Sequence, residues 1–187
     1  MAAQIAAAGG LPTTVRYAEV AVPGIAIGLV AGAFAAGVAA LAGLPAVQTV
    51  TIAAALGIPL ALLGAGYCVL LAMGRFGVGA VGPAALYWLV GFPLARLIDE
   101  YAVAQVLGHD SVLREPLLSF LLFQALLSIG FAIGFLWLHE RLAPSWLIRI
   151  RGHNPVAADL VERYLNQVEA LDRRRARAPR AGHRDTS

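Results

Sequence analysis

A group of titratable side chains that could do acid/base chemistry lies between two apolar stretches of this sequence. The group consists of Arg96, Asp99, Glu100, His109 and Asp110. If this segment is helical, Arg96 faces both neighbouring carboxylates, because residues three and four positions apart share one helix face. Carboxylates and an imidazole can transfer protons or bind a cation. The group is either a polar site at the outer face of a membrane or a solvated loop with a local ion pair, and we favour the loop.

A second histidine stands beside an acid in the run His139-Glu140-Arg141. A catalytic zinc site of the HExxH type needs another histidine four residues after the first, so that both face one side of a helix. Ala143 occupies that position, and the single cysteine, Cys68, lies in an apolar run. The sequence also has no CxxC pair, no P-loop and no GxSxG motif. It therefore predicts no metal, no cofactor and no catalytic residue, so we lean away from an enzyme.

Two further polar residues, Gln124 and Ser128, stand one helical turn apart inside an apolar stretch. Polar side chains at such a depth usually hydrogen-bond between helices, although a transport path would also need them. No Asp, Glu, Lys or His stands in the middle of an apolar stretch, and proton-coupled transporters tend to need one. The pattern favours a structural role.

Small residues recur at every fourth position in the first apolar stretch, at Gly24, Gly28 and Gly32, and Gly57 continues the pattern in the second stretch. Small residues let helix backbones approach closely in lipid, where helix association depends on packing. The pattern predicts either a face for self-association or for a protein partner, or a contact between the first two helices of the chain.

A basic cluster near the C-terminus consists of Arg173, Arg174, Arg175 and Arg177. Arginines beside a membrane attract anionic lipid, each by about 1 kcal/mol near the surface. We expect contact with anionic lipid here and no binding of nucleic acid, because the cluster is tethered next to the bilayer.

The composition indicates that the polar residues described above are positioned by helices in a membrane. Of the 187 residues, 59% are hydrophobic and only 13% are charged, and the mean hydropathy is +0.75. A soluble domain carries about a quarter charged residues, so this chain could not cover a water-facing surface. All 14 basic residues are arginine. The lack of lysine beside abundant Ala, Gly and Val is typical of a GC-rich bacterial genome, such as an actinobacterial one.

Four stretches are long and apolar enough to cross a hydrocarbon core of about 30 Å. We predict spans at about 20–43, 47–73, 76–98 and 117–138. The third span has an alternative frame, 84–106, which would place Arg96, Asp99 and Glu100 inside the membrane. Each buried charge would cost about 2.5–3.5 kcal/mol at the bilayer centre, so we prefer the frame 76–98.

The arginines also predict the orientation, because cytoplasmic loops carry an excess of Lys and Arg. With four spans, one side of the membrane holds the N-terminal segment, the connection between the second and third spans, and the C-terminal segment. These carry every arginine except Arg96 and Arg114. We therefore expect a multi-pass protein of the cell inner (plasma) membrane, with both termini in the cytoplasm.

The domain organisation that follows has three parts. They are a cytoplasmic tail at 1–19, a transmembrane domain at 20–141 and a cytoplasmic tail at 142–187. Asn154 before Pro155 is a good helix start, and an apolar stripe predicts an amphipathic helix at about 155–175. Beyond Pro179 the chain is basic and polar, and we expect disorder there.

The predicted fold class is all-α: an integral membrane bundle of four transmembrane helices with a C-terminal amphipathic cytoplasmic helix. Three function classes fit such a chain. The first, which we favour, is a non-catalytic accessory or scaffold subunit of a larger membrane complex, with lipids and protein partners or self-association within the membrane. The second is a small oligomeric transporter or channel. The third is an intramembrane enzyme acting on a lipid-linked substrate at the outer face.

Overall fold

The computed structural model describes residues 11–177, and within this range the chain forms five helices and no strand. The helices are α1 (Thr13–Leu41), α2 (Ala46–Ala72), α3 (Val81–Leu107), α4 (Leu117–Ile150) and α5 (Pro155–Arg177). The first four are long and apolar enough to cross a membrane. The all-helical prediction is thus confirmed for the described residues, and four such helices indicate a multi-pass membrane protein. The predicted disorder beyond Pro179 lies outside the described residues.

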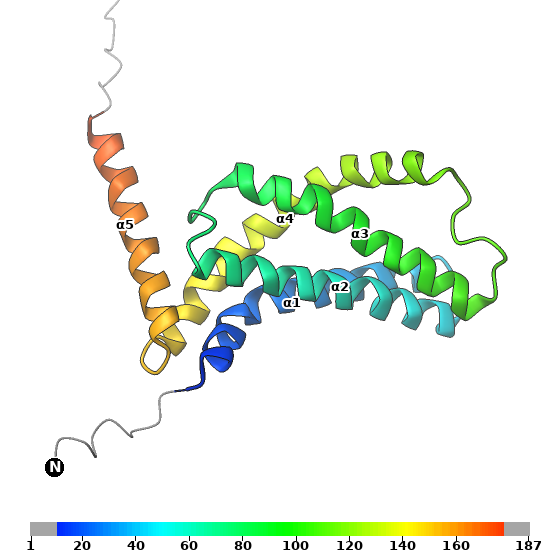
Figure 1. Ribbon diagram of the computed structural model, residues 1–187, viewed down its shortest axis with the longest axis horizontal. Helices are drawn as coiled ribbons and strands as arrows, with labels where there is room; N and C mark the ends of the chain where they lie inside the picture. Colours follow the sequence, from blue (N-terminus) through cyan, green and yellow to red (C-terminus); the bar gives the residue numbers. More distant parts are fainter. Residues whose placement is uncertain (1–10, 178–187) are drawn as a thin grey trace, which may run out of the picture.

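Helices α1 to α4 run side by side along one elongated bundle, and α5 lies across one end of it (Figure 1). We call this the α5 end, and the first helix also begins there. At the other end, the loop end, short segments join α1 to α2 and α3 to α4. Both described ends of the chain therefore lie at the same end of the bundle, as an even number of passes requires.

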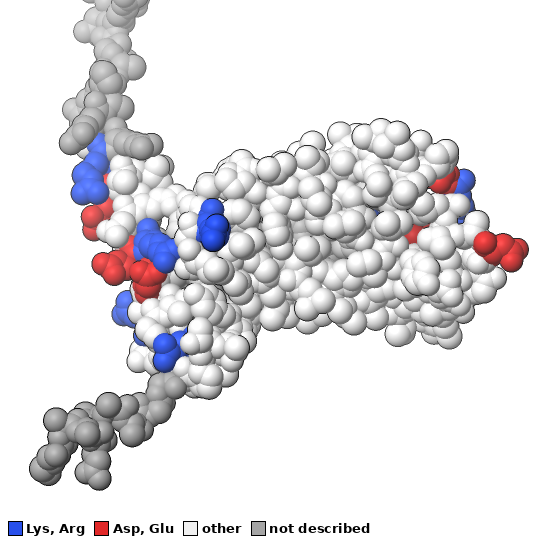
Figure 2. All heavy atoms as spheres, in the orientation of Figure 1, with Lys and Arg blue, Asp and Glu red and all other residues white. Residues whose placement is uncertain are grey.

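Charged side chains gather at the two ends of the bundle, and on the face that Figure 2 shows, the surface between these ends is almost free of charge. At the α5 end lie the arginines Arg16, Arg75, Arg149, Arg151, Arg163 and Arg173. The loop end carries Arg114 together with Glu100, Asp110 and Glu115. An uncharged belt between two charged ends is the surface that a bilayer requires of a spanning protein.

Helix α3 differs in its bounds from the preferred third span. It begins at Val81, because Gly74 and Gly79 adopt positive φ angles of 73° and 67° and keep residues 74–80 in a loop. It ends at Leu107, where Gly108 adopts the left-handed conformation at φ 66°. These bounds resemble the alternative frame 84–106. Arg96 and its two carboxylates consequently lie inside the helix, about two to three turns from its end.

Helix α4 is longer than the predicted fourth span, with 34 residues. At about 1.5 Å per residue it extends about 51 Å, well beyond a hydrocarbon core of about 30 Å. It continues past His139 because that side chain is buried, as are Leu147 and Ile150 in the last turns. The additional length carries the chain to the α5 end.

Helices α1 and α2 meet backbone to backbone along a glycine seam. The seam consists of Gly24, Gly28 and Gly32 on α1 and Gly57 and Gly64 on α2. A Cβ atom on Gly28 would lie 2.2 Å from the backbone nitrogen of Ala61, and one on Gly24 would lie 2.1 Å from the carbonyl oxygen of Gly64. Of the two interpretations of the small-residue pattern, the structure shows the contact within the chain.

Helices α2, α3 and α4 meet through an aromatic cluster of Tyr67, Trp88, Phe131 and Phe135. The Trp88 ring is fully buried, with its centroid 4.7 Å from that of Phe131 and 4.6 Å from that of Phe135. Tyr67 packs edge-on against Phe135 at 5.1 Å. Ring edges against ring faces are favourable beyond the apolar area that they bury.

Candidate functional site

The loop end contains a polar pocket of about 420 Å³, which we call the loop-end pocket. Its polar lining comes from three parts of the chain: Gln48 on α2, Glu100 on α3, and His109, Ser111 and Arg114 in the loop that follows α3. Helix α3 positions Glu100, and the Gly108 cap turns the chain so that His109 faces the same space. A carboxylate, an imidazole and a guanidinium therefore line one pocket.

Only two of the five titratable residues that the sequence groups together line this pocket. Glu100 and His109 line it, whereas Asp110 is exposed and does not. Arg96 lies one turn away and donates hydrogen bonds to both Asp99 and Glu100. Asp99 is almost fully buried, and its second oxygen, Oδ1, has no hydrogen-bond partner.

The pocket has the groups needed to bind a polar head group. Among the hydrogen bonds of the described residues, none joins His109 to Glu100. The carboxylate of Glu100 is already held by Arg96. No group of three or more His, Cys, Asp or Glu side chains within residues 11–177 is placed to hold a metal ion.

A second polar cluster, which the sequence did not reveal, is buried at the α5 end. The Sγ of Cys68 lies 3.4 Å from the Nε2 of His139, and both residues are about 1% exposed. The Tyr67 ring stands edge-on to the imidazole at 5.2 Å. A thiol beside an imidazole is the pair used in nucleophilic catalysis. Here the pair is sealed from solvent, so it packs the bundle and meets no substrate.

Tyr164 of α5 extends this buried cluster. Its hydroxyl donates to Oε1 of Glu140 across 3.4 Å. Burial raises the pKa of the Tyr164 phenol, and the Glu140 carboxylate beside it raises that pKa further. The phenol is therefore neutral at any ordinary pH and serves as a permanent donor between α5 and α4.

Gln124 and Ser128 both face the interior of the bundle, where they are 5% and 1% exposed. The Ser128 hydroxyl donates to the carbonyl oxygen of Ala125 in its own helix, at 2.6 Å. The Oε1 atom of Gln124 has no hydrogen-bond partner. The two side chains therefore do not hydrogen-bond to each other and form no chain of polar contacts through α4.

A hydrogen-bonded corner fixes α5 to the bundle. Asn154, which is fully buried, donates from Nδ2 to the carbonyl oxygen of Arg16 at 2.8 Å and to Oε2 of Glu19 at 2.9 Å. Its Oδ1 accepts from the backbone N–H groups of Val156 and Ala157, at 3.0 and 3.2 Å. One side chain thus caps the start of α5 and also binds the start of α1.

Two more residues complete the corner around Glu19. The indole N–H of Trp146 donates to the carbonyl oxygen of Glu19 at 2.7 Å. The Nε2 of His153 lies 3.1 Å from the Glu19 carboxylate. Helices α1, α4 and α5 are therefore tied together at one point, which sets the angle at which α5 leaves the bundle.

Helix α5 is only half covered by the bundle. Ala157, Leu160 and Val161 are buried against it, and Arg163 donates to the carbonyl oxygen of Leu71 at 3.3 Å. The second half of α5 lies across the same end of the bundle (Figure 1), with Gln167 beside Gly79 of the loop before α3. Three large apolar side chains are exposed there, Leu165, Val168 and Leu171, at 57%, 55% and 46%. We call these three the exposed stripe.

The predicted lipid contact lies at the end of the same helix. Arg173 is exposed and lies 3.8 Å from the carboxylate of Glu169. Arg174, Arg175 and Arg177 belong to α5, but their side chains lie outside the described residues.

Comparisons with models of protein families, with curated proteins and with solved structures find no significant match to this chain. A function must therefore be argued from the geometry of the chain itself. Two features are candidates: the loop-end pocket, and α5 with its exposed stripe.

Proposed function

We propose that the protein is a non-catalytic accessory subunit of a larger membrane complex, and that α5 is the element that binds the partner. The single observation that carries this proposal is the exposed stripe on a helix that the corner holds in a fixed position. A helix that served only to cover the bundle would not need three large exposed apolar side chains on one side.

The charges on α5 favour a protein partner over the lipid surface for this stripe. An interfacial helix on anionic lipid carries mainly Lys and Arg on its polar face. In α5 the acidic residues Asp159, Glu162, Glu169 and Asp172 are spread along the helix, whereas four of its five arginines stand in the last five residues. Apolar residues at spacings of three on one face are what a hydrophobic groove in a partner binds. Anionic lipid remains the proposed contact of the four arginines at the end of the helix.

The same proposal includes an orientation. The α5 end carries most of the arginines, and such an end faces the cytoplasm in membrane proteins. We therefore propose that both termini are cytoplasmic, that the membrane is the plasma membrane, and that the partner is met on the cytoplasmic side.

The test is purification of the tagged chain in mild detergent, with Val168→Glu as the variant. We expect the wild-type chain to carry a companion protein in fixed stoichiometry and the variant to lose it, because the new charge lies within the exposed stripe. The matched control is Asn166→Glu, which adds the same charge on the opposite, polar face and should keep the companion. A wild-type chain that elutes as a monodisperse monomer without any companion would contradict the proposal.

A second candidate function follows from the loop-end pocket, which brings Glu100, His109 and Arg114 together. These groups suit an enzyme that acts on a lipid-linked substrate at the outer face, with Arg114 binding the head group. Single Ala substitutions of the three residues test this candidate. If purified protein turns over such a substrate and all three variants keep that activity at equal expression, the pocket is not the site.

A further inference from the structure

A long apolar furrow runs between α1 and α4 from the α5 end towards the middle of the bundle. On α1 it is lined by Val22, Ala26, Val30 and Phe34, which stand four positions apart and so share one face. On α4 it is lined by Arg149, Leu142, Leu138 and Gly134, in order from the α5 end. Two pockets make up the furrow. The first includes Ala26 and Leu142, and the second begins at the next residue of α1, Ile27, and one turn away on α4, at Leu138. The second pocket is also lined by residues of α2 and α3, namely Leu56, Leu60 and Phe92.

The length of the furrow suits an acyl chain. Its two pockets hold about 310 and 490 Å³. From Val22 to Ala35 the furrow follows α1 for about 20 Å, at about 1.5 Å per residue. One leaflet of a hydrocarbon core is about 15 Å deep, so a single acyl chain fits this length.

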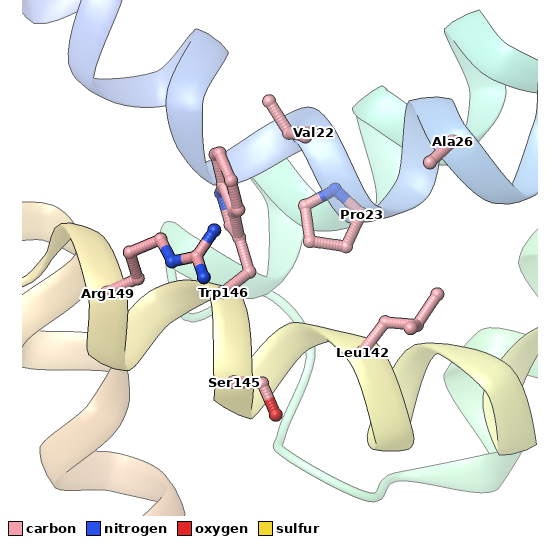
Figure 3. Close-up of a pocket in the computed structure, with 7 residues that line it drawn as sticks. All are labelled: Val22, Pro23, Ala26, Leu142, Ser145, Trp146 and Arg149. Atoms are coloured by element: carbon pink, nitrogen blue, oxygen red, sulfur yellow. The ribbon is translucent and has the colours of Figure 1, made fainter.

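The mouth of the furrow carries a positive charge. Figure 3 shows Arg149 and Trp146 at one end of the first pocket, with Pro23 near its middle and Ala26 and Leu142 towards the other end. Within residues 11–177, no carboxylate forms a salt bridge with Arg149. The Glu19 carboxylate, which belongs to the neighbouring corner, is bound by Asn154 and His153. Arg149 is therefore available to an anion from outside the chain.

We propose that this furrow is a specific site for an anionic phospholipid, with one acyl chain between α1 and α4 and the phosphate on the Arg149 guanidinium. A guanidinium binds phosphate oxygens with paired N–H donors. The Trp146 indole lies beside it at the depth where aromatic side chains meet lipid head groups. The apolar walls and the charged mouth are complementary to the two parts of one phospholipid. The site is independent of the exposed stripe on α5.

The experiment is a lipid titration of the delipidated, purified protein, followed by native mass spectrometry. Phosphatidylglycerol and phosphatidylcholine with identical acyl chains are compared, and inorganic phosphate is added as a competitor. We expect one phosphatidylglycerol to bind about fivefold more tightly than phosphatidylcholine. This ratio corresponds to the attraction of about 1 kcal/mol between one arginine and anionic lipid near a membrane surface. We also expect phosphate alone not to displace it, because the acyl chain contributes most of the binding.

Two pairs of matched variants separate the mouth from the walls. Arg149→Gln should remove the preference for phosphatidylglycerol, whereas Arg151→Gln, which loses the same charge at the same end, should keep it. Gly134→Leu should abolish the site by filling the furrow, whereas Gly130→Leu should not. Both glycines have open space where a Cβ would lie, so both variants should fold.

Three results would overturn the proposal. The two lipids could bind equally, the two Arg variants could behave alike, or Gly134→Leu could leave lipid binding intact. A fourth result would assign the furrow to a protein helix: Gly134→Leu releases a companion protein and keeps the lipid. Val168→Glu should retain the lipid site in every case, so failure of the accessory-subunit proposal is distinguishable from failure of this one.

Discussion

Two pairs of helices in this bundle associate in opposite ways. Helices α1 and α2 touch through backbone atoms along the glycine seam, where a Cβ on Gly28 would lie only 2.2 Å from Ala61 N. Helices α3 and α4 are held apart by large rings, with Trp88 packed on Phe131 and Phe135 at 4.7 and 4.6 Å between centroids. The contact between α1 and α2 requires glycines, which have no side chain, whereas the contact between α3 and α4 is made by large side chains.

The difference shows how helices associate where the solvent is itself apolar. Burial from water supplies no attraction between helices inside lipid, so close packing must supply it. A glycine seam packs closely because the two backbones can approach each other, so the seam tolerates no added side-chain atom. An aromatic cluster packs closely through the contact area and the geometry of its rings, so the bundle loses stability in proportion to the ring atoms that are removed.

The largest effect should come from adding atoms to the seam. Gly28→Leu places a side chain into the backbone of α2, so we expect destabilisation by more than about 3 kcal/mol and loss of folded protein. Unfolding in detergent micelles, followed by circular dichroism, measures this. Gly37→Leu on the same helix is the control, because a Cβ there meets nothing within 4 Å. Equal stability of the two variants would remove the distinction between the seam and the rest of α1.

Removing atoms from the aromatic cluster should cost less. Trp88→Ala leaves a cavity among the rings, so we expect the free energy of unfolding to fall by about 3 kcal/mol. The bundle should still fold, with a lower melting temperature. Thermal unfolding of the purified variant gives the shift. Trp137→Ala is the comparison, since that ring is 60% exposed and should change the melting temperature little. If Trp88→Ala abolished folding altogether, the two kinds of contact would not differ in tolerance.

The corner provides a third kind of contact, made by polar groups. Asn154→Ala removes the cap of α5 and the bonds to Arg16 and Glu19, so we expect a loss of about 2 kcal/mol. The loss should be confined to the elements that Asn154 joins, so hydrogen exchange should be faster for amides of α5 and of the start of α1, and unchanged for amides of α2. Faster exchange throughout the bundle would mean that the corner supports the apolar contacts as well.

The smallest effect should be a gain in stability. Gly37→Ala and Gly130→Ala place a methyl group in open space on α1 and α4. Alanine is a better helix former than glycine, so each variant should be more stable by up to about 1 kcal/mol. The same measurement of thermal unfolding applies. Destabilisation by either change would show that a partner or lipid contact occupies the space.

The long helices were predictable from the sequence, because apolar runs of about 20 residues have few other uses. Their ends were not. Helix α1 begins at Thr13, well before the predicted span, and its Glu19 carboxylate accepts a hydrogen bond from Asn154 and lies 3.1 Å from His153, both from a distant part of the chain. Helix α3 continues past the predicted end of its span because Arg96 pairs with both carboxylates that follow it.

The candidate sites were predictable only in part. The polar residues around Glu100 could be found by composition, but not which of them line the loop-end pocket, since Gln48 enters it from α2. The corner joins residues more than a hundred positions apart, as Trp146 and Glu19 show at a separation of 127. The furrow likewise depends on how α1 and α4 cross. It could not be predicted from the sequence, because the apolar residues that line a groove are of the same types as those that face lipid.

The residues that form the corner come from the beginning and the end of the described chain, and this separation affects the order in which contacts can form during synthesis. Glu19 and Asn154 are 135 positions apart. Synthesis proceeds from the N-terminus at about 5–20 residues per second, so α1 and α2 can pair long before the corner can close. Until Asn154 leaves the ribosome, Glu19 and the Arg16 carbonyl lack these partners. Closure of the corner is thus possible only after all four bundle helices have been made.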